Sequence, residues 1–191
     1  QRRYGHNGRH LQDDRQRLFG LHRLIDTGIK VVGVGSVGTR CFIALFQGRD
    51  PDDPLMLQIK EAGPSELSHH LGDSEYPNQG QRVVEGQRLT QAQSDTFLGW
   101  TTGARGRDFY VRQLRDWKGS VEIEGSTPDQ LGFYARLCGM TLARGHARSG
   151  DAVAISAYLG RSDRTDRAIA RFARTYARQN LEDFEAFRAA I

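Results

Sequence analysis

The chain has 191 residues, which suits one domain with a hydrophobic core or part of a larger protein. Its hydrophobic fraction of 38%, with 22 glycines besides, is typical of a globular rather than a disordered protein. The net charge of +4 is lower than that of most nucleic-acid-binding domains. No stretch approaches the roughly 18 to 20 apolar residues of a membrane helix.

Cysteine usage and the N-terminus bear on where the protein works. Cys41 and Cys138 lie far apart in unlike contexts, so they indicate neither a disulfide framework nor a zinc site. We therefore expect a reduced, cytoplasmic protein with neither a membrane nor a nucleic acid as partner. The chain starts without Met on a polar tail that has no apolar signal segment, so we expect that an N-terminal half is missing.

In chain order, the first predicted elements are a helix and a meander of three strands. Leucine spacing predicts an amphipathic helix over about 10–26 that ends near Gly28. A β-branched and aromatic run extends from Val31 through a glycine-rich segment to Phe46. A turn at 48–54 and a further strand at 55–60 complete an antiparallel meander.

The second half of the chain is predicted to be mainly helical. A polar helix over 77–93 precedes a hairpin formed by 97–101 and 108–114. Thr127 and Gln130 form a capping box for a helix that runs to about Arg148, and its apolar residues on nearly every side predict burial. A last helix spans about 162–189. The predicted class is α+β, divided into 1–27 (tail and helix), 28–125 (small antiparallel sheet lobe with one helix) and 126–191 (helical portion).

The glycine-rich segment is the first candidate site. Its spacing, Gly33-x-Gly35-Ser36-x-Gly38, matches a dinucleotide-binding string, but a strand follows it where that fold needs a helix. Strand, glycine loop and strand is the arrangement that covers phosphates in protein kinases. A tight hairpin that uses glycine for its twist is the structural alternative.

Lys60 and Glu85 extend this hypothesis. Only three of the 27 basic residues are Lys, and Lys60 closes the strand that follows the glycine hairpin, with Gln58 on the same face. A lysine at this position binds the nucleotide phosphates in kinases. Glu85 lies on the next helix and shares with Leu89 and Ala92 the side expected to face the core. It is a candidate partner for Lys60, although Arg82 and Arg88 are also near in sequence.

Two further features allow both functional and structural readings. His146 and Asp151 are candidates for a catalytic pair, but four residues separate them where kinases have one, and a His at a helix end also suits the helix dipole. An arginine stripe on the last helix can bind an acidic partner or form an ordinary solvated face. The stripe consists of Arg164, Arg167, Arg171, Arg174 and Arg178.

Five segments together resemble the bacterial family called domain of unknown function 2252. They are VVGVGSVGTRC (31–41), QIKEA (58–62), NQGQRVVEGQR (78–88), DFYVRQLRD (108–116) and HARSGD (146–151). The resemblance covers about 17–185 and looks like the C-terminal portion of a protein about twice as long. It implies a fold related to protein kinases and aminoglycoside phosphotransferases, with the base and metal-ligand candidates in the missing N-terminal half.

The resulting expectation is a kinase-like portion that binds ATP, with Mg²⁺ as a further cofactor whose ligands are not identifiable in this chain. Gly33, Gly35, Ser36, Gly38, Lys60 and Glu85 are the expected nucleotide-binding residues, carried over by motif match. Phosphotransfer would need the missing half, so we expect this chain alone to be inactive. A non-catalytic binding or scaffolding module is the alternative.

Overall fold

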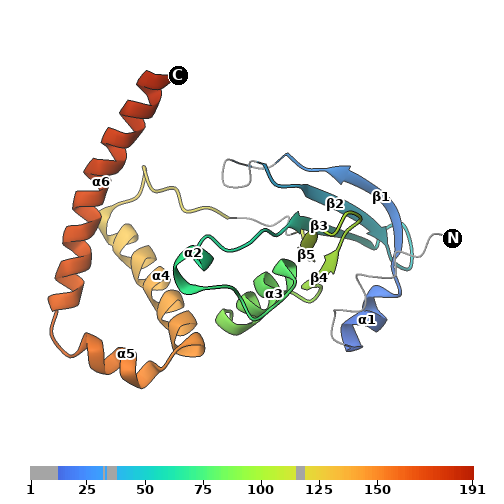
Figure 1. Cartoon of the computed structure of the whole chain (residues 1–191), viewed down its shortest axis with the longest axis horizontal. Coiled ribbons are helices and arrows are strands. Elements are labelled where there is room, and N and C mark those ends of the chain that lie inside the picture. Colours follow the sequence, from blue (N-terminus) through green and yellow to red (C-terminus); the bar gives the residue numbers. More distant parts are fainter. Residues whose placement is uncertain (1–12, 32, 34–37, 115–118) are drawn as a thin grey trace. The chain divides into compact units, whose positions relative to one another are not determined.

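In the computed structural model of the chain, five strands form one antiparallel sheet in the order β1-β2-β3-β5-β4 (Figure 1). The structure describes residues 13–31, 33, 38–114 and 119–191. The strands are β1 (Arg23–Ile29), β2 (Cys41–Gln47), β3 (Pro54–Glu61), β4 (Gly99–Thr102) and β5 (Asp108–Gln113). With the helices around and after it, this sheet confirms the α+β class and the predicted meander.

The start of the meander differs from the prediction. Helix α1 is short (Asp13–Phe19), and the chain turns into β1 where the helix was expected to continue to residue 26. Leu24 lies in β1 and is paired with Phe46 of β2, so its helical spacing from Leu21 was fortuitous. Backbone pairing of six β1 residues with β2 outweighs that pattern, and the first strand is 23–29 rather than a strand beginning at Val31.

One face of the sheet carries the main core. Side chains from β2, β3 and β5 pack there with Phe97, and Phe19 of α1 meets the ring of Phe46 edge-on, with ring centres 5.1 Å apart. Cross-strand neighbours share a face because side chains alternate along each strand. The core cluster consists of Ala44, Phe46, Leu55, Leu57, Phe97 and Val111.

Helix α3 (Gln79–Thr90) lies between β3 and β4 in the chain and confirms the predicted polar helix. The short helix α2 (Ser68–Leu71) precedes it. Leu89 was expected on the core side of α3 but is half exposed, whereas Val84 is fully buried. The helix packs more closely near its N-terminus, where Gly80 approaches the backbone of Phe109. The buried face therefore centres on Gly80 and Val84.

Helix α4 (Pro128–Ser149) begins and ends as predicted. Its capping box forms, because the backbone N–H of Thr127 donates to Gln130 Oε1 at 2.8 Å and that of Gln130 donates to Thr127 Oγ1 at 3.3 Å. The predicted burial of this helix is wrong: none of its residues is buried, and Phe133 is 65% exposed. Apolar residues on several sides indicated a buried helix, but no described element of its unit covers them.

The chain divides into two compact units, Gln1–Gly145 and His146–Ile191. The sheet and most of α4 belong to the first. The second contains the last turn of α4, then α5 (Ala152–Leu159) and α6 (Arg164–Ala190), and α6 confirms the predicted last helix. Among the described residues, no helix has the length and hydropathy needed to span a bilayer.

Candidate functional site

Lys60 lies near the end of β3, on the face of the sheet opposite the main core. It pairs with Cys41 of β2 on one side and with Tyr110 of β5 on the other, and Tyr110 pairs in turn with Trp100 of β4. These four side chains form a row across the sheet, because directly paired residues point to the same side. We call this surface the lysine face. It also includes Gln58 and Arg112, which pair with each other two residues away from Lys60 and Tyr110 on the same strands.

The predicted glycine loop follows β1, and its described C-terminal end leads into β2 at Cys41, the residue paired with Lys60. Gly33 and Gly38 are described, whereas Gly35 and Ser36 lie outside the described residues. Gly38 has a backbone φ of +83°, an angle that residues other than glycine rarely adopt. The backbone N–H of Lys30 donates to the carbonyl of Cys41 at 2.8 Å at the base of the hairpin. A strand, not a helix, therefore follows the glycines, as predicted.

Glu61 anchors the end of this loop. Its carboxylate accepts a hydrogen bond from the backbone N–H of Arg40 at 3.0 Å and forms ion pairs with Arg40 at 3.1 Å and Arg107 at 2.8 Å. Burial alone would raise the pKa of Glu61, but the backbone N–H of Arg40 and the guanidinium groups of Arg107 and Arg40 outweigh it and lower the pKa. The loop between β1 and β2 is thus fixed to β3 at its C-terminal end.

Helix α3 is held at its first turn by Asp108 of β5. One carboxylate oxygen accepts from Asn78 Nδ2 at 2.6 Å and from Thr102 Oγ1 at 3.1 Å, and the other accepts from the backbone N–H of Gln79 at 2.8 Å. Asn78 also caps the helix by accepting from the backbone N–H of Gln81. This network fixes the position of α3 on the β4–β5 hairpin.

Glu85 is half-buried on α3, and its carboxylate pairs with Arg88 at 2.9 Å. Arg88 also donates to the carbonyl of Leu98 at 3.1 Å and lies over the ring of Trp100, 5.7 Å from its centre. Because Trp100 belongs to the row of Lys60, Glu85 is connected to the lysine face through Arg88. The pairing of Glu85 with Lys60 itself stays a prediction.

Gln58 and Arg112 contribute to the lysine face in a way that the sequence did not indicate. The side-chain oxygen of Gln58 accepts from both Nε and Nη2 of Arg112, at 3.1 and 3.0 Å. The side-chain amide nitrogen of Gln58 lies 3.3 Å from the free thiol of Cys41. Alternation along β3 places Gln58 beside Lys60, but only the pairing of β3 with β5 identifies Arg112.

His146 and Asp151, the weaker catalytic candidates, lie in the second unit. His146 is in the last turn of α4, and its carbonyl accepts from the backbone N–H of Gly150. Asp151 is the N-cap of α5, where Oδ1 accepts from the backbone N–H groups of Val153 and Ala154 at 2.9 and 3.0 Å. These contacts give Asp151 a structural role in α5, and a catalytic role for either residue stays a prediction.

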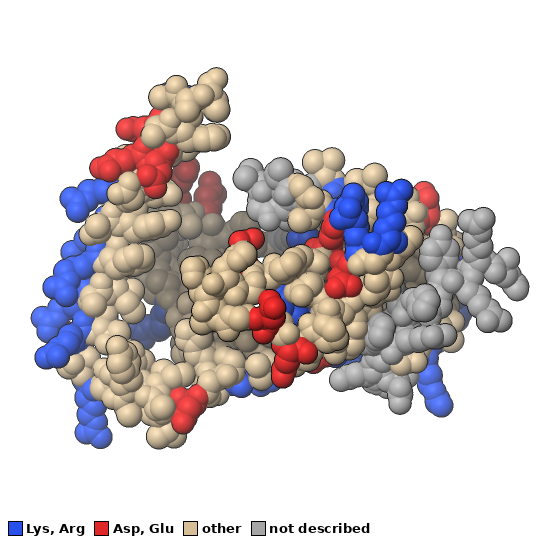
Figure 2. Space-filling view, in the orientation of Figure 1, with Lys and Arg blue, Asp and Glu red and all other residues tan. Residues whose placement is uncertain are grey.

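The arginine stripe lies on α6. Figure 2 shows basic side chains gathered along this helix and acidic ones toward its C-terminal end. Arg167 forms an ion pair with Asp163, one turn before it. The aromatic rings of Phe172 and Tyr176 stack on each other, with centres 5.7 Å apart. Mixed charges and an exposed aromatic pair fit an amphipathic helix with a solvated face, and binding of an acidic partner by the stripe stays a prediction.

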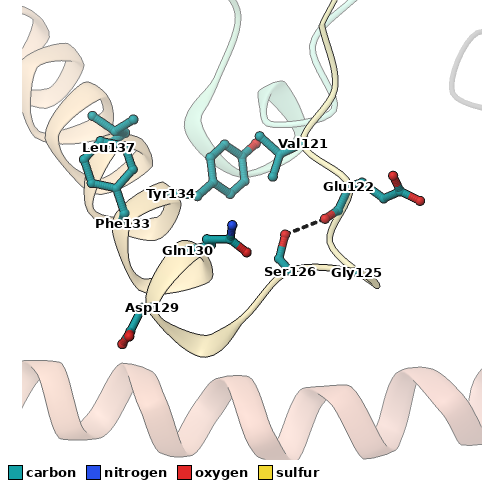
Figure 3. Close-up of a pocket in the computed structure, with 9 residues that line it drawn as sticks. All are labelled: Val121, Glu122, Gly125, Ser126, Asp129, Gln130, Phe133, Tyr134 and Leu137. Atoms are coloured by element: carbon teal, nitrogen blue, oxygen red, sulfur yellow. Dashed lines mark hydrogen bonds between the residues drawn. The ribbon is translucent and has the colours of Figure 1, made fainter.

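A separate groove of about 690 Å³ lies at the start of α4 (Figure 3). Val121 and Tyr134 point toward each other there, whereas the carboxylates of Glu122 and Asp129 point away from the space between them. Ser126 Oγ donates to the carbonyl of Glu122 at 2.5 Å, which shapes the loop before the helix. The polar groups of this groove do not converge on a common point, as those of a ligand site usually do.

Comparison with known proteins places the chain in a family. The profile of a family described as "Uncharacterized protein conserved in bacteria (DUF2252)" matches residues 2–190. The chain therefore belongs to DUF2252, and the match extends further than the predicted 17–185. No curated protein and no solved structure matches the chain.

Proposed function

We propose that this DUF2252 chain binds a nucleotide, with ATP as the first candidate, by holding its phosphates between the glycine loop and the lysine face. The observation that carries the proposal is the position of Lys60. It is half-buried on the strand after the glycine hairpin, directly opposite the first residue of β2. A compact ammonium group there suits a phosphate oxygen.

The order of the elements supports this proposal. In protein kinases a glycine-rich hairpin covers the phosphates, a lysine on the third strand contacts them, and a glutamate on the following helix holds the lysine. Here the hairpin joins β1 and β2, Lys60 is on β3, and Glu85 is on α3. The backbone N–H groups of the loop would approach phosphate oxygens closely, because glycines carry no side chain.

The proposed role of this chain is binding and orientation of the nucleotide. Phosphotransfer would also need a base and groups that hold Mg²⁺. The described residues bring together no group of three or more His, Cys, Asp or Glu side chains that could hold a metal ion. The described residues therefore do not by themselves provide a set of ligands for Mg²⁺.

A non-catalytic kinase-like module is the second candidate function. The observation that favours it is Asp151, since this candidate for the catalytic pair caps helix α5 with its carboxylate. Such a module would still bind the nucleotide but would transfer no phosphoryl group. Incubating a protein that also contains the expected N-terminal half with ATP labelled on its γ-phosphate separates the two candidates, because only a transferase releases or transfers the label.

Nucleotide binding is tested by titrating ATP into the whole chain and following its thermal unfolding. We expect Lys60→Ala to weaken binding by about 1.5–3 kcal/mol, the contribution of a charge-assisted hydrogen bond. Arg49→Ala is the matched control, because it removes an exposed cation from the turn at the opposite end of β2 and β3. Equal ATP affinity of Lys60→Ala and the wild type would contradict a phosphate-binding role for Lys60. A wild type without affinity for ATP would contradict the proposed function as a whole.

A further inference from the structure

Gln58 is a buried amide whose polar atoms are both used to hold neighbouring side chains. It is 4% exposed, and its oxygen accepts two hydrogen bonds from Arg112 while its nitrogen lies against the Cys41 thiol. A buried side chain with these contacts fixes the orientation of the guanidinium group. Gln58 is therefore a positioning residue for a cation on the lysine face.

Arg112 is held in position by Gln58, but no ion pair to it is formed by the residues that the structure describes. Its guanidinium is half-buried. The neutral side-chain amide of Gln58 accepts from two of the five N–H donors of the Arg112 guanidinium, but it does not neutralise the positive charge. Removing a charge from water is unfavourable unless a counter-charge accompanies it, so this arrangement favours a bound anion.

Arg112 and Lys60 lie within reach of one ligand. Gln58 is paired with Arg112 and Lys60 with Tyr110, so Lys60 and Arg112 are diagonal neighbours on the same face. Diagonal neighbours on adjacent strands are about 7–8 Å apart, which long side chains span easily. Two cations at that separation can contact adjacent phosphate groups of one molecule.

We infer that Arg112 is a second phosphate-binding residue, held in place by Gln58, and that the site takes nucleoside di- or triphosphates in preference to monophosphates. The inference rests on the proposed nucleotide function and adds a residue and a substrate class to it. A planar guanidinium presents several N–H donors and matches phosphate oxygens well. A ligand with two or three phosphates offers Lys60 and Arg112 separate phosphate groups, so we expect it to bind more tightly than a ligand with one.

The test is calorimetric titration of the whole chain with ATP, AMP and inorganic tripolyphosphate. We expect Arg112→Met to weaken binding of ATP and tripolyphosphate about tenfold or more, and to weaken AMP binding less. Arg23→Met is the matched control. Like Arg112, Arg23 donates to a glutamine paired with it across the sheet, in this case Gln47, but Arg23 is exposed on the edge strand β1. This variant should bind all three ligands as the wild type does.

The outcomes separate the inference from the function on which it rests. If the wild type binds none of the three ligands, both fail. If Lys60→Ala loses affinity while Arg112→Met binds tripolyphosphate like the wild type, the inference alone is overturned. The inference also fails if Arg112→Met weakens ATP and AMP equally and leaves tripolyphosphate unchanged, because Arg112 would then contact the nucleoside.

A second measurement needs no variant and so does not depend on whether Arg112→Met folds. Phenylglyoxal modifies accessible guanidinium groups, and peptide mass spectrometry reports the modification at each arginine. We expect tripolyphosphate to protect Arg112 severalfold in the wild type and to leave Arg23 unprotected. Equal modification of Arg112 with and without tripolyphosphate would overturn the inference.

Discussion

The carboxylate of Glu61 joins three parts of the sheet unit at one point. It contacts the end of the glycine loop at Arg40 and the β4–β5 turn at Arg107, and it is itself the last residue of β3. Both arginines are nearly half exposed, so each ion pair contributes modestly to stability. The combined effect is to keep the end of the loop beside Lys60.

Replacing this carboxylate should change how stability depends on pH. We expect Glu61→Gln to reduce the free energy of unfolding by about 1 kcal/mol at pH 7. Because the folded state lowers the pKa of Glu61, the stabilisation is complete above the ordinary glutamate value of about 4.3 and is lost as the pH falls through the lowered pKa. Urea unfolding of both proteins at pH 7, 4 and 3 measures this difference.

The difference between the two proteins should therefore shrink toward zero in acid. Glu66→Gln serves as the control, since Glu66 is exposed in the loop after β3 and its replacement should leave stability nearly unchanged. A constant difference between Glu61→Gln and the wild type from pH 7 to pH 3 would contradict an ionic role for Glu61.

At the same scale, the sequence predicted the position of Lys60 on its strand beside Gln58 but not the neighbouring position of Arg112. Alternation along one strand is enough to place Gln58 and Lys60 together. The partner of Gln58 depends on which strand lies beside β3 and in what register, and β5 comes about fifty residues later in the chain. Long-range pairing of this kind leaves no periodic signal in the sequence, so a cross-strand cluster escapes pattern analysis.

At the scale of single elements, helix α3 offers a matched pair of glycines. A Cβ at Gly80 would lie 2.2 Å from the carbonyl oxygen of Phe109, whereas a Cβ at Gly86 would meet nothing within 4 Å. The backbone of a central strand cannot move aside cheaply. The same substitution should therefore have opposite effects at the two positions.

We expect Gly80→Ala to destabilise the protein by about 2 kcal/mol, because the added methyl group forces α3 away from β5. Gly86→Ala should stabilise it by about 0.5–1 kcal/mol, since alanine loses less backbone entropy in a helix. Denaturant unfolding of the two variants and the wild type measures both effects. Similar effects of both substitutions would mean that α3 does not pack on β5 as described.

Elements with strong local signals were predicted most accurately. The capping box at Thr127 marked the start of α4, and the turn before Asp108 marked the β4–β5 hairpin. The prediction of a helix over 20–26 was wrong because the leucines there fit both a helix and a strand. Only the pairing with β2 decides between the two structures. Burial of α4 was wrong because the apolar pattern of a helix does not say whether a covering element is present.

At the scale of the whole molecule, the buried side chains among the described residues are confined to the sheet, α3 and the segment just before β4. The core residues lie on β2, β3, β5 and the segment just before β4, whereas α4, α5 and α6 contain no buried residue. Ile169, Phe172 and Tyr176 on α6 are each more than half exposed. Helices gain most of their stability from packing an apolar face, so these helices should be less stable locally than the sheet.

Amide hydrogen exchange of the whole chain tests this expectation residue by residue. Amides of Ala44, Leu57 and Val111 should exchange only through near-global unfolding, because they lie in paired strands within the core. Amides of α6 should exchange at least about a hundredfold faster through local opening. Equal protection of α6 and the sheet would mean that the aromatic face of α6 is covered. Repeating the measurement at tenfold dilution would then show whether a second copy covers it, because protection that depends on self-association falls as the protein concentration falls.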